Sequence, residues 1–259
     1  MFEEMKGKTL FVTGAASGMG RAVAVRFGSL GCKVAVAARR PDAAAETVRL
    51  VEEAGGQAIF VPCDVADEAS VKAAIDTTVE TLGSLDYAFN NAGCGADGVH
   101  IPFAPLTEVT EADWLKVIGT NLTGMFHCLK YELIQMNRQG GGAIVNTSSI
   151  GGLHMTPGFG AYGPSKAGVI AITQTAAVEN AKNGIRVNVI CPGPTDGTNL
   201  MKDSRESGAQ DVDFLVNNVI PMGKLGTTQD VADSVVFLCS SMAGHITGCA
   251  LPVCGGMQM

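Results

Sequence analysis

The sequence predicts an α/β fold in which a parallel β-sheet is covered by helices on both of its faces. Short apolar runs alternate regularly with longer amphipathic stretches, a pattern typical of repeated βαβ units. Neither an internal repeat nor a low-complexity linker interrupts the alternation. Because the 259 residues are enough for one large sheet with its helices, we predict a single domain over residues 1–259.

The order of the elements follows from the apolar runs and from the residues that end them. Gly31 and Gly184 close predicted helices, and Pro41 opens one. A polar loop is expected at 94–106, and an irregular segment at 196–220 is expected to be a mobile cover over the substrate. Strands are predicted at 8–13, 33–38, 57–63, 85–90, 142–148, 185–191 and 250–253. Helices are predicted from the turn at 14–20 up to residue 30, at 41–54, 67–82 and 114–135, from near Pro164 to residue 182, and at 228–240.

Composition and charge narrow the possible classes of protein. Charged residues make up 17% and apolar residues 46% of the chain, which favours surface buried between identical subunits. With a net charge of -7 there is no broad basic field for nucleic acid. The eight cysteines form no Cys-x-x-Cys pair, so we expect buried free thiols and no metal. No signal peptide or long unbroken apolar stretch is present, so we expect a soluble cytoplasmic protein that has no membrane partner.

A glycine-rich turn follows the first predicted strand and precedes a helix. It has the spacing Gly-x-x-x-Gly-x-Gly, which differs from the commonest dinucleotide fingerprint and can also be no more than a tight turn. Its place on the first strand of a βαβ pattern favours a site where backbone N–H groups and a helix N-terminus hold a pyrophosphate. The predicted cofactor contacts in this turn are Gly14, Ser17, Gly18, Met19 and Gly20.

The end of the second predicted strand indicates which ribose is bound. An acidic side chain there would accept from a 2′-hydroxyl, whereas arginine suits a 2′-phosphate. Because Arg39 and Arg40 stand at this position, we predict NADP, with Arg39 as the main contact and Ser17 as a second donor. The alternatives are NAD, and a pair of solvated arginines steadied by Asp42. Asp64, after the third strand, is placed either to meet an adenine amino group or to cap the next helix.

Tyr162 and Lys166 are four residues apart, so a helix that begins near Pro164 would place them on one face. An ammonium beside a phenol favours phenolate, so Lys166 together with a bound cationic ring should lower the pKa of Tyr162 from its ordinary value of about 10 towards neutrality. Such a phenol can act as a general acid or base. By itself, however, Tyr-x-x-x-Lys occurs by chance in many helices, so the pair needs support from its surroundings.

The glycine turn and the Tyr162–Lys166 pair belong to a larger set of ordered motifs. The set comprises Thr13-Gly-x-x-x-Gly-x-Gly20, Asp64-Val65, Asn90-Asn-Ala-Gly93, Asn121 in Asn-Leu-Thr-Gly, Ser149, Tyr162-x-x-x-Lys166 and Pro192-Gly193. Together these motifs resemble those of the compact, single-domain short-chain dehydrogenase/reductases, over about Lys6 to Met257. The resemblance implies a Rossmann-type, doubly wound sheet of seven strands. It also implies a homotetramer built through the helices that follow the fourth and fifth strands.

The resemblance also implies roles for matching residues. Tyr162 would give a proton to a carbonyl or take one from an alcohol, Ser149 would hydrogen-bond the substrate oxygen, and Lys166 would bind the nicotinamide ribose. Asn121 would hold a water that links Lys166 to solvent. The alternatives are that Asn121 is a buried amide tying a helix to the backbone and that Ser149 is a strand-end cap. Further implied cofactor contacts are Asp64, Val65, Asn91, Ala92, Gly93, Pro192, Gly193 and Thr195, besides Tyr162 and Lys166.

Two positions depart from the family pattern. Gly197 stands where a threonine is often found after Pro192-Gly193, with Thr198 next, which leaves the contact to the nicotinamide amide open. Cys254 stands where an aspartate is common, which we expect to alter a subunit or loop contact.

The expected substrate walls are mainly apolar and carry no cluster of arginines for a carboxylate or phosphate. They come from 94–97, 151–159 and the segment 196–220, and His154 can equally be an ordinary loop histidine. We therefore predict hydride transfer between NADP(H) and a neutral secondary alcohol or ketone. The alternatives are the same chemistry with NAD(H) and a non-catalytic dinucleotide-binding regulator. The predicted substrate contacts are Ser149, His154, Met155, Phe159 and Leu200.

Overall fold

One sheet of seven parallel strands forms the centre of the computed structural model, which describes residues 2–95, 101, 103–206, 208 and 211–257. The strand order is β3-β2-β1-β4-β5-β6-β7, so the predicted doubly wound sheet is confirmed. All the predicted strands are present, with small shifts at their ends. The strands are β1 (Thr9–Thr13), β2 (Lys33–Ala38), β3 (Gln57–Pro62), β4 (Tyr87–Asn90), β5 (Gly142–Thr147), β6 (Ile185–Pro192) and β7 (Ala250–Val253).

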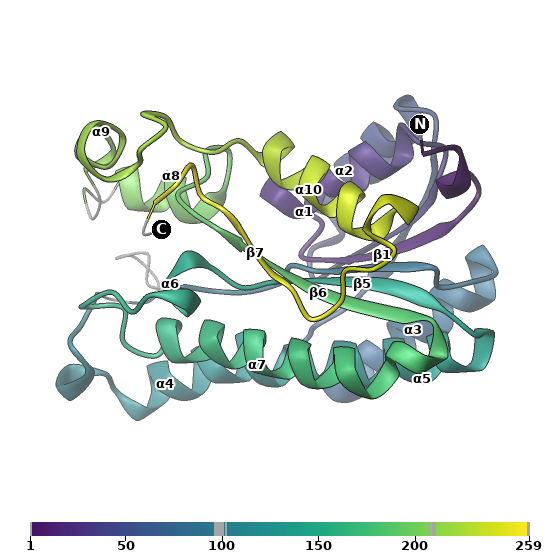
Figure 1. Cartoon of the computed structure of the whole chain (residues 1–259), viewed down its shortest axis with the longest axis horizontal. Helices are drawn as coiled ribbons and strands as arrows, with labels where there is room; N and C mark the ends of the chain where they lie inside the picture. The colour runs from purple at the N-terminus through teal and green to yellow at the C-terminus, as the bar shows by residue number, and fades with distance from the viewer. Residues whose placement is uncertain (1, 96–100, 102, 207, 209–210, 258–259) are drawn as a thin grey trace.

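Helices cover both faces of the sheet (Figure 1). One layer holds α1 (Gly18–Gly28), α2 (Pro41–Glu53) and α10 (Thr228–Cys239), and the other holds α3 (Glu68–Leu82), α5 (Gly124–Gln139) and α7 (Tyr162–Asn180). Each layer packs on its own apolar core, because both faces of the strands are buried and both carry apolar side chains. The remaining helices are α4 (Glu111–Ile118), α6 (Ile150–Leu153), α8 (Asn199–Glu206), α9 (Val212–Phe214) and the single turns Glu3–Met5, Leu106–Glu108, Ala181–Asn183 and Ser241–Ala243.

The long helix predicted at 114–135 is interrupted by one π-helical turn. It runs as α4, the π turn at Gly119–Thr123, and α5. Such turns are frequent at functional sites, and this one contains Asn121. The helix predicted to begin near Pro164 begins at Tyr162, which leaves the proline in its first turn, where a missing N–H costs nothing.

Most of the described part of the segment 196–220 is helical, at residues 199–206 and 212–219, so the prediction of irregular structure there is wrong. It contains α8, α9 and a π turn at Leu215–Val219. Two of the polar residues that suggested a loop are helix caps: the Thr198 hydroxyl accepts from Met201 N at 3.2 Å and the Asp211 carboxylate from Phe214 N at 2.9 Å. Residues 207, 209 and 210 of this segment lie outside the described residues.

The strand order reverses between β1 and β4, and the turns that follow these two strands lie side by side. The Thr13 hydroxyl at the end of β1 accepts from the backbone N–H groups of Asn91 and Ala92, at 3.0 and 3.1 Å. Ligands of open α/β sheets bind in the crevice outside the carboxyl ends of the strands at such a reversal. In the part of the chain that the structure describes, no helix is both long and apolar enough to cross a membrane.

Candidate active site

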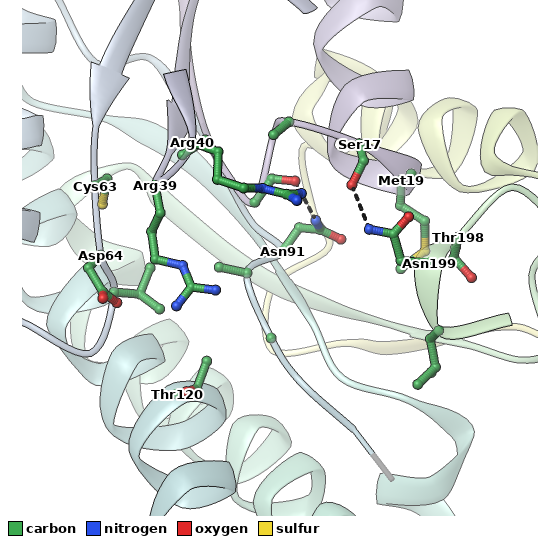
Figure 2. Close-up of a pocket in the computed structure, with 18 residues that line it drawn as sticks. Ser17, Met19, Arg39, Arg40, Cys63, Asp64, Asn91, Thr120, Thr198 and Asn199 are labelled. Carbon is green, nitrogen blue, oxygen red and sulfur yellow. Dashed lines mark hydrogen bonds between the residues drawn. The ribbon is translucent and has the colours of Figure 1, made fainter. Parts of the chain in front are cut away.

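A cavity of about 310 Å³ opens at the carboxyl ends of β1, β2 and β4 (Figure 2). Most of the predicted cofactor residues line it, together with several that the sequence did not indicate. The predicted residues in its wall are Gly14, Ser17, Gly18, Met19, Arg39, Arg40, Asp64, Val65, Asn91, Ala92 and Gly93. The others are Ala16, Ala38, Cys63, Thr120, Thr198, Asn199 and Leu200, of which only Leu200 had been singled out, as a substrate contact.

The glycine turn brings backbone, without side chains, to the edge of this cavity. Gly14 has a φ of 64°, a left-handed conformation that favours glycine. A Cβ on Gly20 would lie 2.9 Å from Asn91 Nδ2 and against the Gly14 carbonyl oxygen, so only glycine fits there. Ser17 precedes α1, but its side chain does not cap the helix. The first N–H groups of α1 therefore remain available to an anion.

Arg39 and Arg40 reach from the end of β2 into the cavity (Figure 2). Neither guanidinium has a hydrogen-bond or ion-pair partner among the residues that the structure describes, whereas the exposed Arg49 pairs with Glu46. The alternative in which Asp42 steadies the arginines is therefore not observed. Two unpaired cations beside an uncapped helix N-terminus form a local positive site in a chain of net charge -7.

Polar groups at the ends of β3 and β4 complete the cavity. The Asp64 carboxylate accepts from Ala66 N at 3.1 Å, and the residue that caps α3 is Asp67. The cap alternative for Asp64 is thus wrong, and its side chain stands in the cavity wall. Asn91 Oδ1 is buried and has no hydrogen-bond partner in the described part of the chain. This orphaned acceptor, the glycine cradle and the free guanidinium groups fit a dinucleotide.

Beside the Asn91–Gly93 turn that lines the cavity, Tyr162, Lys166 and Ser149 come together. Lys166 Nζ lies 5.7 Å from the centre of the Tyr162 ring and donates to the Thr147 carbonyl at 3.0 Å. Ser149 caps α6, because its hydroxyl accepts from Gly151 N at 3.0 Å. The predicted cap role is therefore present, and the same hydroxyl also acts on Tyr162 by a hydrogen bond.

Asn121 ties the π turn to the segment that follows β4. Its amide accepts from Cys94 N at 2.8 Å and donates to the Cys94 carbonyl at 2.7 Å and to the Ser165 hydroxyl at 3.0 Å. The alternative of a buried structural amide is thus observed. A Cβ on Gly93 would lie 3.1 Å from Asn121 Oδ1 and 3.5 Å from Lys166 Nζ, so the end of the cavity touches both side chains.

Burial shifts the pKa values of both titratable groups at this end. Desolvation lowers the pKa of Lys166 to about 8, and it raises the pKa of Tyr162, although the Ser149 hydroxyl opposes that rise. Lys166 is not among the groups that lower the pKa of Tyr162. The prediction that Lys166 brings Tyr162 towards neutrality is therefore not supported by the protein groups alone, because desolvation of the phenol outweighs an ammonium 5.7 Å from its ring.

Six predicted cofactor residues do not line the cavity: Gly20, Tyr162, Lys166, Pro192, Gly193 and Thr195. Pro192 and Gly193 lie at the end of β6, and Thr195 is buried with its hydroxyl donating to the Gly193 carbonyl at 2.9 Å. Thr198 lines the cavity instead, next to Gly197, the position where the family pattern is broken. The neighbouring Asn199 donates to the Ser17 hydroxyl at 3.4 Å, which joins α8 to the glycine turn (Figure 2).

Apolar side chains gather around Tyr162. The Phe159 ring meets the Tyr162 ring edge-on at 5.9 Å, and a Cβ on Gly95 would lie 3.1 Å from the Tyr162 ring and 3.3 Å from Leu200. Met155 follows α6 and is exposed, with its sulfur 3.0 Å from a Cβ on Gly163 in the first turn of α7. His154 is also exposed, and its side chain makes no polar contact with the described residues.

Some expected features fall outside what the structure describes. Ala96 and Asp97, which we predicted in the substrate wall, are not among the described residues.

Within the described residues, no cluster of three or more His, Cys, Asp or Glu side chains could hold a metal ion. All eight cysteines are free thiols, six of them buried.

Comparisons with known proteins place this site in a family. A family model described as Enoyl-(Acyl carrier protein) reductase matches residues 14–258. An uncharacterized oxidoreductase of Thermotoga maritima is 37% identical over 252 residues, which cover 97% of both chains. A 3beta-hydroxysteroid dehydrogenase 1 of Eggerthella lenta is 38% identical over 262 residues, which cover 100% of this chain and 97% of that one.

Among solved structures, an NAD+-bound xylitol dehydrogenase superposes with a TM-score of 0.91 at 34% identity. The match covers 98% of this chain and 100% of that one. The chain belongs to the short-chain dehydrogenase/reductase family and is an oxidoreductase of that type, as the motifs had indicated.

Proposed function

We propose that the protein transfers hydride between NADP(H) and a neutral secondary alcohol or ketone, with Tyr162 as the general acid or base. The observation that carries the proposal is the convergence of Ser149, Tyr162 and Lys166 beside Gly93, which lines the cavity that also holds Arg39 and Arg40. A bound nicotinamide supplies or accepts the hydride. The side chains of the protein have to bind the dinucleotide, orient the substrate and move one proton.

Tyr162 is suited to move that proton. In the reducing direction, charge develops on the substrate oxygen, and Tyr162 Oη would donate its proton there while the Ser149 hydroxyl donates a second hydrogen bond. In the oxidising direction Tyr162 would take the proton of the alcohol. Because burial alone raises the pKa of Tyr162, the protein keeps the phenol protonated, ready for reduction.

Lys166 and Asn121 would support this transfer. Lys166 is held by the Thr147 carbonyl, which leaves two of its three donors for a ribose. The Asn121 amide donates hydrogen bonds to the Cys94 carbonyl and to the Ser165 hydroxyl. Ser165 Oγ in turn donates to the Tyr162 carbonyl at 2.7 Å. Asn121 thus fixes the first turn of α7, and a water on Asn121 that connects Lys166 with solvent remains part of the proposal.

The choice of NADP rests on the two arginines at the end of β2. Unpaired guanidinium groups match the 2′-phosphate, with which they can form charge-assisted hydrogen bonds. The same chemistry with NAD(H) is the alternative, and it is favoured by the NAD+-bound xylitol dehydrogenase among the similar structures. Titration of NADP+ and NAD+ by fluorescence would decide, and tighter binding of NAD+ would overturn the assignment of Arg39.

The substrate is proposed from the groups around Tyr162, which are apolar or small. Phe159, Met155 and Leu200 can enclose a cyclic or medium-sized alcohol. The similarity to a 3beta-hydroxysteroid dehydrogenase adds hydroxysteroids to this class. A panel of hydroxysteroids, cyclic alcohols, ketones and sugar alcohols, run with both cofactors, tests the proposal through the nicotinamide absorbance. If no substrate in the panel turns over while the dinucleotide binds, the non-catalytic regulator gains support.

We further propose a homotetramer in the cytoplasm, built from single-domain subunits whose segment 196–220 covers the substrate. Support for the tetramer comes from large apolar side chains that are exposed on the layer of α4, α5 and α7. They are Leu115, Phe126, Ile134 and Val178. Light scattering of the purified protein would measure the mass, and a monomer would contradict this assembly.

A further inference from the structure

Glu132 is a fully buried carboxyl group in the middle of α5, and the proposed chemistry does not use it. Its exposed fraction is 0%, and its Oε2 accepts from Asn90 Nδ2 at 2.8 Å. Asn90 is the last residue of β4 and is itself 1% exposed. The next residues, Asn91 to Gly93, form the turn that lines the cavity. Glu132 is therefore attached to the strand end from which the dinucleotide site begins.

A chain of hydrogen bonds determines which way the Asn90 amide faces. The Thr173 hydroxyl donates to the Val169 carbonyl at 2.6 Å, so its oxygen accepts from Asn146 Nδ2 at 2.9 Å. Asn146 Oδ1 therefore faces Asn90 and accepts from Asn90 Nδ2 at 3.0 Å. Both N–H groups of Asn90 are then used, one on Asn146 and one on Glu132. Turning the amide round would lose both bonds.

This orientation leaves two buried acceptors without a donor among the described residues. They are Asn90 Oδ1 and Glu132 Oε1, which belong to two side chains already joined through their other atoms. A buried carboxylate with a single hydrogen bond is strongly disfavoured, and so is an unpaired buried amide oxygen. One proton on Glu132 Oε1, donated to Asn90 Oδ1, would give both atoms a partner and close a ring of two hydrogen bonds.

Among the residues that the structure describes, no cation acts on the Glu132 carboxyl group to stabilise its ionised form. Burial raises the pKa of Glu132 to about 8, and the only opposing group is Asn90. The ionisable groups that interact with it electrostatically are Cys128 on α5 and Cys63 after β3, and burial raises the pKa of both thiols, that of Cys63 to about 12. These thiols are neutral wherever Glu132 titrates.

The other elements packed on α5 carry their ionisable groups elsewhere. Those of α3 lie at the surface, where Glu68 pairs with Lys130. On α7, no ionisable residue stands between Lys166 and Glu179. Arg186 of β6 donates to backbone carbonyls at the end of α10. The remaining ionisable residues of α3, β4 and β6 are Lys72, Asp76, Glu80, Tyr87 and Cys191, and none of them acts on the pKa of Glu132.

We propose that Glu132 is a neutral carboxylic acid paired with the Asn90 amide, and that this pair positions the Asn91–Gly93 turn of the dinucleotide site. Glu132 is a positioning residue, because it acts through Asn90 and touches no reacting atom. Loss of its proton would place a charge beside Asn90 Oδ1 and loosen the end of β4. Dinucleotide affinity should therefore fall as the pH rises through about 8. The inference rests on the proposed dinucleotide binding in this cavity.

The first test needs no variant. Infrared difference spectra of the whole protein between pH 6 and pH 10 should show the C=O band of a protonated, hydrogen-bonded carboxyl group that is lost at the higher pH. In Glu132→Gln this band should be absent from the difference spectrum. A wild-type protein without the band at pH 6 would show an ionised Glu132 and overturn the proposal.

The second test compares dinucleotide affinity across pH, with NADP+ as the probe. Glutamine copies the protonated acid, since it can accept from Asn90 Nδ2 and donate to Asn90 Oδ1. Glu132→Gln should match the wild-type Kd at pH 6. Lys166 titrates in both proteins, so the effect of Glu132 is the difference between them: by pH 9 the wild type should weaken at least threefold more than Glu132→Gln. Glu132→Ala, which cannot pair with Asn90, should weaken binding at every pH.

Exposed Glu80 on α3 supplies the matched control, because Glu80→Gln should follow the wild type throughout. Equal pH profiles for the wild type and Glu132→Gln would contradict the positioning role. The two proposals fail separately: no NADP+ or NAD+ binding by the wild type at pH 6 would remove the proposed function. Normal binding at pH 6 with no carboxyl band would remove only the role of Glu132.

The pH dependence of the free energy of unfolding gives a third test. The folded pKa of Glu132 lies above the ordinary 4.5, so its stabilising contribution is complete below that value and is lost as the pH rises towards about 8. Relative to Glu132→Gln, the unfolding equilibrium constant of the wild type should rise up to roughly tenfold per pH unit in this window. A constant ratio would indicate that the carboxyl group titrates normally.

Discussion

The two ends of the candidate active site, the catalytic side chains and the nucleotide cavity, differ in how their polar groups are satisfied. At the catalytic end the protein supplies the partners: Lys166 is held by the Thr147 carbonyl and Asn121 by the Cys94 backbone. At the nucleotide end Arg39, Arg40 and the start of α1 have no partner among the described residues. One end is organised before a ligand arrives, whereas the other presents charges and donors that a ligand has to satisfy.

This difference separates two kinds of mutational effect. Changes at the organised end should affect the rate of the chemical step, because catalytic groups have to be held in place before the transition state forms. Changes at the open end should affect which dinucleotide binds and how tightly, because its charges are met only by the ligand. The variants below test this division.

The largest effect is expected for Tyr162→Phe. Removing the proton donor should lower kcat by about 10²- to 10⁴-fold, while the Kd for NADP+ stays within about twofold. Steady-state assays at the nicotinamide band and a fluorescence titration measure the two quantities. Tyr131→Phe is the control, because that hydroxyl bonds Glu68 on the surface and should be dispensable for turnover. Substantial activity in Tyr162→Phe would remove Tyr162 from the mechanism.

The next largest effect is expected for Arg39→Asp. An acidic side chain at the end of β2 repels a 2′-phosphate and accepts from a 2′-hydroxyl, so the affinity for NADP+ should fall by about 10- to 100-fold and that for NAD+ should rise. Isothermal titration with both dinucleotides measures the change. Arg138→Asp makes the same charge change at the exposed end of α5 and should leave the preference as it is. If Arg39→Asp binds both dinucleotides as the wild type does, another group selects the cofactor.

A smaller effect concerns the stability of the organised end. The folded pKa of Lys166 is about 8, below the ordinary 10.5, so the unfolded chain binds more protons between these values. The contribution of Lys166 to the free energy of unfolding therefore rises with pH through this window and is lowest below pH 8. Relative to Lys166→Met, the wild type should gain on the order of 1 kcal/mol per pH unit. Urea unfolding measures this gain.

Lys182→Met provides the comparison for that experiment, because Lys182 is exposed. Its unfolding free energy should run parallel to that of the wild type between pH 8 and 10. Parallel curves for Lys166→Met as well would mean that the buried ammonium is not destabilised by its surroundings.

The smallest effect is expected for Asn199→Ala. The bond from Asn199 Nδ2 to the Ser17 hydroxyl is 3.4 Å long and exposed, so its loss should change the Kd for NADP+ by only about two- to threefold. Stopped-flow fluorescence can also compare the dissociation rates. Asn218→Ala removes a similar side-chain amide from the same segment, away from the glycine turn. A change above tenfold would give α8 a larger part in holding the dinucleotide.

Short-range patterns predicted much of this molecule. The strands, the glycine turn and the placement of Arg39 could be read from the chain, because apolar runs and glycine positions reflect local backbone requirements. The segment 196–220 could not, since residues such as Thr198 and Asp211 suit both loops and helix caps. The direction in which the protein groups alone shift the pKa of Tyr162 was also not predicted from the sequence, because this shift depends mainly on burial of the phenol.

The sequence by itself determined the order of the βαβ units, the family, and the identity of the residues that converge on the site. Only the tertiary structure decided which polar groups are paired and which are left for a ligand. In the folded chain the Thr195 hydroxyl bonds the Gly193 carbonyl, Thr198 lines the cavity, and Glu132 is buried against Asn90. The physical reason is that hydrogen-bond satisfaction and desolvation depend on neighbours distant in the chain: 42 residues separate Asn90 from Glu132.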